Sequence, residues 1–196
     1  MREWVRQLVW RISDSILEKR ARKIFAGKTL SKKADHRQFV IMSVSGHGNL
    51  GDDAMLTALV QSLRARGEND ITILLHHDRD RSDFERFDAR LVSVEGYFDK
   101  RASKKALLRL HEALAGATDF IVIGADVVDG RYFAPRSWRR LFMGELAATI
   151  GLDVSLVGFS FSDRAAPRIK AYLRETYQNY RICARDPVSA KRVGSV

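Results

Sequence analysis

The stretch Ser43-Val44-Ser45-Gly46-His47-Gly48-Asn49-Leu50-Gly51-Asp52-Asp53-Ala54-Met55 decides the fold that we expect for this chain. The apolar segment Phe39-Val40-Ile41-Met42 precedes it and has the β-branched, uninterrupted character of a buried strand. Apolar residues at helical spacing follow it: Met55, Leu56, Leu59, Val60 and Leu63. A strand, a glycine-rich turn and a helix in this order are typical of the first βα unit of an open α/β sheet.

The same alternation continues to the end of the chain. The apolar pattern predicts strands at 39–45, 71–75, 91–94, 120–123, 154–159 and 180–184. It predicts helices at 50–66, 101–115 and 137–150, a short one within 78–88, and two more that begin at Pro167 and after Asp186. We therefore expect a Rossmann-like parallel sheet of about six strands, with helices on both faces and a binding site at the carboxyl ends of the strands.

Residues 1–37 form a basic leader to the domain proper, which we place at 38–196. Residues 2–25 are predicted to form an amphipathic helix, and 27–37 a polar linker. The apolar stripe of this helix comprises Val5, Leu8, Val9, Ile12 and Ile16. One interpretation docks this stripe on the domain or on a partner domain. The other places the helix at an anionic lipid surface, as a peripheral membrane contact.

The charge of the chain is unevenly distributed. The formal net charge is +10 over 196 residues, and residues 1–37 alone contain eleven Lys and Arg against four Asp and Glu, a net of +7. The remaining domain is close to balanced. This distribution argues against a nucleic-acid-binding domain, whose basic surface should lie on the folded module itself.

The composition indicates where in the cell the protein is expected. The single cysteine, Cys183, excludes an internal disulfide and is expected to be an inert part of the core. No long uncharged apolar run is present, so we expect no transmembrane helix. Charges at Arg2, Glu3, Arg6 and Arg11 interrupt any signal-peptide core. We expect a cytoplasmic protein, with the inner face of the membrane as the alternative site if the leader helix binds lipid.

The turn from Gly46 to Gly51 matches the dinucleotide-binding pattern G-x-G-x-x-G literally. Asp52 and Asp53 argue against a dinucleotide site. They lie where a pyrophosphate would meet the helix N-terminus, and their negative charges would repel it. Carboxylates at this position suit hydrogen bonding to sugar hydroxyls. The alternative for Asp52 is a purely structural N-cap.

Four landmarks carry a resemblance to a known family. They are Gly46-x-Gly48-Asn49-x-Gly51-Asp52-Asp53-Ala54, the strand and loop from Ile121 to Gly130, the strand and loop from Leu156 to Ser162, and Arg185-Asp186-Pro187-Val188-Ser189. In this order they resemble the polysaccharide pyruvyl transferases. The chain departs from the family at Gly124-Ala125-Asp126, where consecutive glycines are usual.

The resemblance implies one half of a GT-B-like architecture, in which two Rossmann-like halves face each other across a cleft. By this comparison the chain corresponds to the first half, and the second half is absent from it. The implied reaction moves an enolpyruvyl unit from phosphoenolpyruvate to two hydroxyls of one sugar, on a cell-surface polysaccharide or its lipid-linked precursor. Phosphoenolpyruvate is then a donor substrate, and we expect neither a cofactor nor a metal ion.

The resemblance and the positions of the residues suggest roles for them. Arg185 would clamp the anionic donor, with a structural contact to Asp186 as the alternative. Asn49, Asp52 and Asp53 would bind and activate the acceptor. His47 would carry protons beside them, with a solvated loop histidine as the alternative. The remaining substrate-binding candidates are Gly46, Gly48, Gly51, Asp126, Asp129 and Ser160. Arg136, Arg139 and Arg140 beside Trp138 are predicted to lie on a solvated helix face.

Two other functions stay open from the sequence. The first is a GT-B glycosyltransferase that uses a nucleotide sugar. The second, from a different class, is a non-catalytic carbohydrate-binding half-protein. Self-association is also open. All three readings share a carbohydrate partner, and none involves a nucleic acid.

Overall fold

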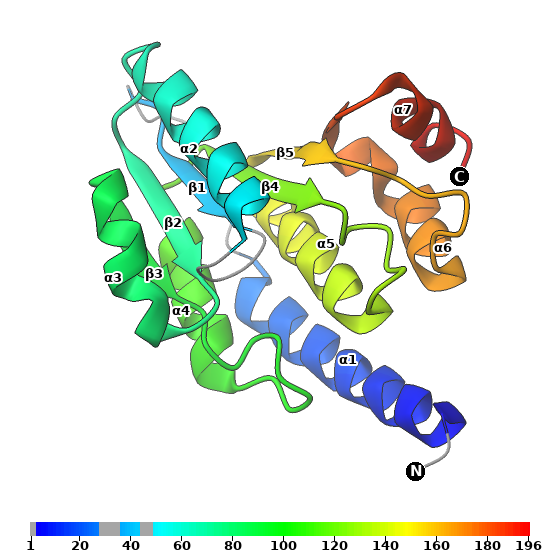
Figure 1. Cartoon of the computed structure of the whole chain (residues 1–196). Coiled ribbons are helices and arrows are strands. Elements are labelled where there is room, and N and C mark those ends of the chain that lie inside the picture. The colour runs from blue at the N-terminus through cyan, green and yellow to red at the C-terminus, as the bar shows by residue number, and fades with distance from the viewer. Residues whose placement is uncertain (1–2, 28–35, 44–48) are drawn as a thin grey trace.

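The computed structural model describes residues 3–27, 36–43 and 49–196, with side chains from residue 6 onward (Figure 1). Three of the predicted substrate-binding residues, Gly46, His47 and Gly48, lie outside the described residues. The chain forms an α/β fold in which strands and helices alternate after one long N-terminal helix. The predicted fold class is therefore confirmed.

Six parallel strands form a single sheet in the order β3-β2-β1-β4-β5-β6. Their bounds are β1 Phe39–Met42, β2 Ile71–Leu75, β3 Arg90–Ser93, β4 Asp119–Ala125, β5 Asp153–Phe159 and β6 Arg181–Ala184. The central strands are buried on both faces: every residue of β1, β2 and β4 is buried. That burial accounts for their continuous apolar sequences, as expected of parallel strands covered on both sides.

Helices cover both faces of the sheet (Figure 1). One apolar core lies between the sheet and α1 (Glu3–Phe25), α4 (Lys104–Leu114), α5 (Ala134–Thr149) and α6 (Pro167–Thr176). A second core lies under α2 (Leu50–Arg64), α3 (Arg81–Phe84) and the 3₁₀ turn η2 (Glu85–Phe87). Short elements complete the chain: the 3₁₀ turns η1 (Asp78–Asp80) and η3 (Tyr177–Asn179), and the C-terminal α7 (Pro187–Val193).

Helix α1 packs against α4 and α5, and contributes to the same core as they do. Its buried face consists of Asp14, Leu17, Ala21 and Phe25, which recur at the three- and four-residue spacing of one helix side. The stripe predicted to dock is a different one. Its docking on the domain is wrong, because Leu8, Ile12 and Ile16 are exposed, while docking on a partner domain stays a prediction. No helix in the described ranges is long and apolar enough to cross a membrane.

A buried cluster of charges joins α1 to α5 and α6. Arg139 is fully buried, and its Nε lies 2.8 Å from Oδ1 of Asp14. Oδ2 of the same carboxylate lies 2.6 Å from Nη1 of Arg168. Arg139 also donates to the Tyr97 carbonyl at 2.7 Å and to the Ser13 hydroxyl at 2.9 Å. The prediction of a solvated face for Arg139 is therefore wrong, because its ion-pair partner comes from a helix 125 residues away.

Strand β6 lies at an edge of the sheet and alternates between exposed and half-buried residues. Cys183 is one of its exposed residues. The expectation that Cys183 belongs to the core is wrong. Ile182 and Ala184 pack against the first core, and Cys183 alternates with them and faces the other, exposed side of the strand.

Asp14→Ala is expected to lower the free energy of unfolding by about 3–5 kcal/mol, because it leaves the Arg139 charge buried without its counter-ion. Urea denaturation measures the change. Arg181→Ala is the control, since the Arg181–Asp153 pair is 3.5 Å long with side chains 65% and 47% exposed. Its removal should cost no more than about 1 kcal/mol. Equal losses in the two variants would contradict a structural role for the buried cluster.

Candidate functional site

The carboxyl ends of the strands meet at one edge of the sheet, and the order of the strands creates a switch point there. β1 and β4 are neighbours, with Met42 beside Val122, but they lead to helices on opposite faces. β1 continues toward α2, and β4 toward α5. Ligands of open α/β sheets bind in the crevice that such a divergence produces.

Helix α2 begins at this edge with a capped first turn. The Asn49 side chain accepts a hydrogen bond from the Gly51 N–H at 3.1 Å and donates through Nδ2 to Asp52 Oδ2 at 3.0 Å. Asn49 is therefore the N-cap, and the alternative of Asp52 as N-cap is wrong. Asp52 and Asp53 lie in the first turn, where the helix dipole favours negative charge.

The two aspartates of this turn face different surroundings. Asp53 forms an ion pair of 3.0 Å with Arg86 and lines a groove between α2 and η2. Asp52 instead acts electrostatically on Arg140, which belongs to α5 on the other face of the sheet. The structure thus brings Asn49 and Asp52 together and directs Asp53 away from them.

Arg140 also lies at this edge, and the prediction of a solvated helix face is wrong for it as well. It is only 4% exposed, and its Nη2 lies 3.3 Å from Nε2 of His76. Burial lowers the pKa of Arg140 to about 10, against an opposing effect of the Asp52 carboxylate. A signal was present in the sequence: Arg140 shares a helix side with Ser137, Gly144 and Ala147, and small residues on one side indicate close packing.

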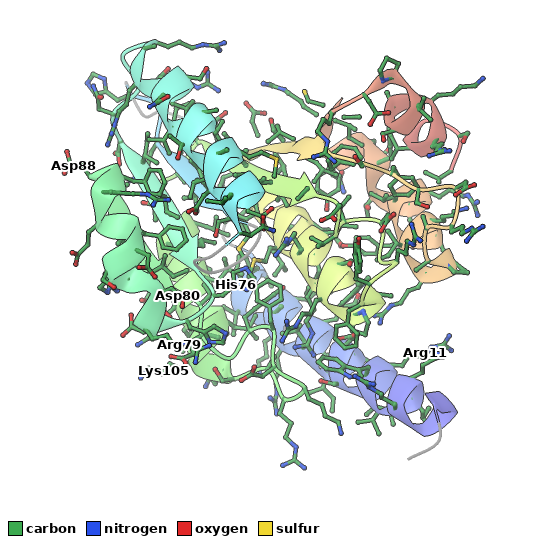
Figure 2. All side chains as sticks on the ribbon, viewed as in Figure 1. Arg11, His76, Arg79, Asp80, Asp88 and Lys105 are labelled. Carbon is green, nitrogen blue, oxygen red and sulfur yellow. The ribbon has the colours of Figure 1, made fainter. Side chains whose placement is uncertain are left out.

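His76 follows β2 and lies near the middle of the molecule (Figure 2). Its ring stacks on Phe98 with centroids 4.6 Å apart, and Nε2 lies 3.3 Å from the Ser43 carbonyl oxygen. Desolvation, followed by the charge of Arg140, lowers the pKa of His76 to about 3. The imidazole is therefore neutral at physiological pH. The neighbouring His77 points elsewhere, and its Nδ1 lies 3.6 Å from Oε1 of Glu95.

The low pKa of His76 predicts a dependence of stability on pH. In the unfolded chain its pKa is near 6.5, so between about pH 6.5 and 3 the unfolded state binds the extra proton. Stability should therefore fall as pH decreases through this window, by up to about 1.4 kcal/mol per pH unit from this group. His76→Gln should flatten this part of the stability profile, measured by urea denaturation at several pH values. His77→Gln is the control, and an equal flattening there would contradict the assignment.

A second part of the edge lies at the ends of β4, β5 and β6. A cleft of about 400 Å³ opens there, and Asp126, Asp129, Tyr132, Ser160 and Ser162 are among the residues that line it. Arg185 follows β6 and donates through Nη2 to the Ser160 hydroxyl at 2.6 Å. Three predicted site positions, 126, 129 and 160, thus share one cleft, and Arg185 contacts it.

Asp186 does not pair with Arg185 among the described residues. Its carboxylate instead caps α7, and accepts hydrogen bonds from the Ser189 N–H at 2.8 Å and the Ser189 hydroxyl at 2.7 Å. These bonds lower the pKa of Asp186. The guanidinium of Arg185 is exposed and has no carboxylate partner in the described part of the chain, so it can receive an anion.

Asp126 and Asp129 have different environments within the cleft. Asp129 is 4% exposed and accepts hydrogen bonds from the N–H groups of Arg131 and Ser162, at 2.9 and 3.2 Å. It therefore holds two loops together. Asp126 is exposed, and the Tyr132 hydroxyl donates to it at 3.3 Å. Within the described ranges, no three His, Cys, Asp or Glu side chains form a metal-binding group.

The last two residues of β4, Gly124 and Ala125, lie where the chain departs from the family pattern. A Cβ at Gly124 would lie 2.5 Å from the Cβ of Phe159, so only glycine fits there. Ala125 has a φ of +45°, in the left-handed region that favours glycine. The position thus suits the glycine that the family usually has, and alanine strains it by about 1–2 kcal/mol.

Ala125→Gly removes this strain, together with one buried methyl group, so it should change the free energy of unfolding little. Ala113→Gly is the control, because Ala113 is equally buried, at 2% against 3%, but lies in the regular helix α4. That variant loses a methyl group and helix propensity without relief of strain. Ala113→Gly should therefore lower the free energy of unfolding by at least about 1 kcal/mol more than Ala125→Gly does. No difference would contradict strain at Ala125.

The comparison with protein families gives one match, and it covers most of the domain. The family model described as polysaccharide pyruvyl transferase matches residues 49–194. Neither a curated protein nor a solved structure matches the chain significantly.

Proposed function

Since this chain belongs to the polysaccharide pyruvyl transferase family, we propose that it transfers a pyruvyl group from phosphoenolpyruvate to two hydroxyls of one sugar. The acceptor is a cell-surface polysaccharide or its lipid-linked precursor, and the product is a cyclic pyruvate ketal. The observation that carries the proposal is the cleft at the ends of β4 to β6, where an unpaired arginine lies beside carboxylate and hydroxyl groups.

Arg185 suits the donor because phosphoenolpyruvate carries both a carboxylate and a phosphate. A guanidinium binds either group through two parallel hydrogen bonds. Arg185 commits Nη2 to Ser160, which orients the guanidinium toward the cleft wall. Ser160 itself is held by its N–H, which donates to the Ala125 carbonyl oxygen at 2.7 Å. Ser160, which holds the Arg185 guanidinium, is therefore itself held between the carboxyl ends of β4 and β5.

Asp126 and Tyr132 suit the sugar. The Asp126 carboxylate is exposed and can accept hydrogen bonds from hydroxyls. Tyr132 is 69% exposed beside it, and an exposed aromatic ring offers a flat apolar surface to the C–H face of a pyranose. Asn49 and Asp52, at the neighbouring strand end, are the second set of acceptor contacts.

The reaction needs acid–base chemistry as well as binding. A proton is delivered to the terminal carbon of the enol, and one sugar hydroxyl adds to the adjacent carbon and loses its proton. The second hydroxyl then displaces phosphate at that carbon, which closes the ketal, and its proton leaves with the phosphate. Asp126 or Asp52 would receive a hydroxyl proton, and Arg185 would stabilise the departing phosphate. Overall, phosphoenolpyruvate and the sugar diol are converted into the pyruvate ketal and inorganic phosphate.

Phosphate release tests the proposal. The full-length protein, incubated with phosphoenolpyruvate and a panel of lipid-linked and free glycans, should release inorganic phosphate in the presence of an acceptor. Arg185→Gln should lower kcat/KM by at least about tenfold, the effect of losing a charge-assisted hydrogen-bond pair. Arg181→Gln is the control, because it makes the same change at the first residue of β6, the strand that Arg185 follows.

Each alternative predicts another outcome. A glycosyltransferase would be stabilised in a thermal-shift assay by nucleotide sugars and not by phosphoenolpyruvate. A binding protein would retain glycans without turnover. Absence of phosphate release across the panel, or equal activity of the two arginine variants, would contradict the proposal.

A further inference from the structure

A groove of about 680 Å³ lies between α1 and the loop that joins β3 to α4. Apolar and basic side chains line it together. The apolar ones are Val9, Ile12, Ile16, Leu17 and Ala102, and the basic ones are Arg20, Lys100 and Arg101. The groove is distant in sequence from the landmarks of the candidate site and shares no lining residue with its cleft.

The outer side of α1 is unusually apolar for an exposed surface. Leu8, Ile12 and Ile16 are 48%, 53% and 45% exposed and recur every fourth residue. At 100° per residue, Ile12 points opposite to Ala21, which is fully buried in the core. The stripe therefore contributes nothing to the core of the domain. Three large apolar side chains in a row on a solvent-facing helix indicate a surface that binds something.

Positive charge surrounds this stripe. Lys19 and Lys23 are exposed and lie on the same side of α1 as Ile12, one and two turns beyond Ile16. Arg20, Lys100 and Arg101 add charge along the groove. Two acids of α1 are engaged elsewhere: Asp14 is buried with Arg139, and Glu18 pairs with Arg22 at 2.9 Å. In the loop between β3 and α4, the residue before Lys100 is the acidic Asp99.

We propose that this surface binds anionic phospholipid. We call it the α1 outer face, and define it as Leu8, Ile12, Ile16, Lys19, Arg20, Lys23, Lys100 and Arg101. The apolar stripe would enter the boundary between headgroups and acyl chains, while the basic side chains contact phosphates. Helix α1 would lie along the membrane surface, held from behind by its buried face.

The charge pattern favours lipid over other occupants. A second copy of the chain, docked through the same face, would bring the basic groups of both copies together. A nucleic acid would satisfy the charges but leave Leu8, Ile12 and Ile16 without an apolar partner. An anionic membrane supplies both negative charge and apolar contact. The inference does not depend on the enzymatic proposal.

Vesicle binding of the full chain tests the inference. Co-sedimentation with phosphatidylcholine vesicles that contain phosphatidylglycerol should retain the protein, whereas pure phosphatidylcholine should not, and added salt should weaken the binding. Lys100→Gln/Arg101→Gln should weaken binding by about tenfold or more. Leu8→Ser/Ile12→Ser should weaken it similarly. These side chains are exposed, so circular dichroism should show an intact fold.

The controls change matched residues on other elements. Leu108→Ser removes an apolar side chain that is 40% exposed on α4, and Arg79→Gln removes a charge from η1 (Figure 2). Neither should alter binding. Ile12→Trp should show tryptophan quenching by brominated acyl chains, beyond that of the parent chain, if the stripe enters the bilayer.

Three outcomes would overturn the inference: no binding of the parent chain to anionic vesicles, equal binding of target and control variants, or a dimer in sedimentation analysis that Ile12→Asp dissociates. The last outcome would assign the face to a second copy. Loss of phosphate release alone would leave vesicle binding unchanged, so failure of one proposal can be told from failure of the other.

Discussion

The parallel pairing of β1 with β4 is the constraint on which the rest of the structure depends. Phe39 lies beside Asp119 and Met42 beside Val122, so segments about eighty residues apart end at the same edge. Because parallel strands need crossover connections, the intervening units must lie to one side, as β2 and β3 do. The pairing thus brings the carboxyl ends of β1 and β4, and the loop that follows β4, to one edge of the sheet.

A second constraint acts through charge. Asp14 receives both Arg139 and Arg168, and thereby fixes the long N-terminal helix to two helices of the domain. A buried ion pair is a weak source of net stability, but it is selective about geometry. Here it holds the same side of α1 against the domain that Leu17, Ala21 and Phe25 bury in the core. As a consequence, the apolar residues Leu8, Ile12 and Ile16 face outward.

The sequence predicted the strands well, because strands buried on both faces require continuous apolar runs with few alternatives. It failed where a distant partner decides a residue's surroundings. Arg139 and Arg140 have the composition of a solvated face, yet both are buried, Arg139 in an ion pair with Asp14 and Arg140 in contact with His76. Within the candidate site, it predicted Asp126 and Ser160 as substrate-binding residues, and both line one cleft. It did not foresee that Asp129 holds two loops together, since only the fold brings Ser162 to it.

The proposed donor site is tested most directly by a titration of the ¹⁵N-labelled chain with phosphoenolpyruvate, followed by NMR. Binding at the carboxyl edge predicts shifts confined to the amides near Ser160, Arg185 and Asp126, with α1 unchanged. Shifts confined to Lys100, Arg101 and the basic residues of α1 would instead show binding by surface charge alone. That result would contradict a donor site at the ends of the strands.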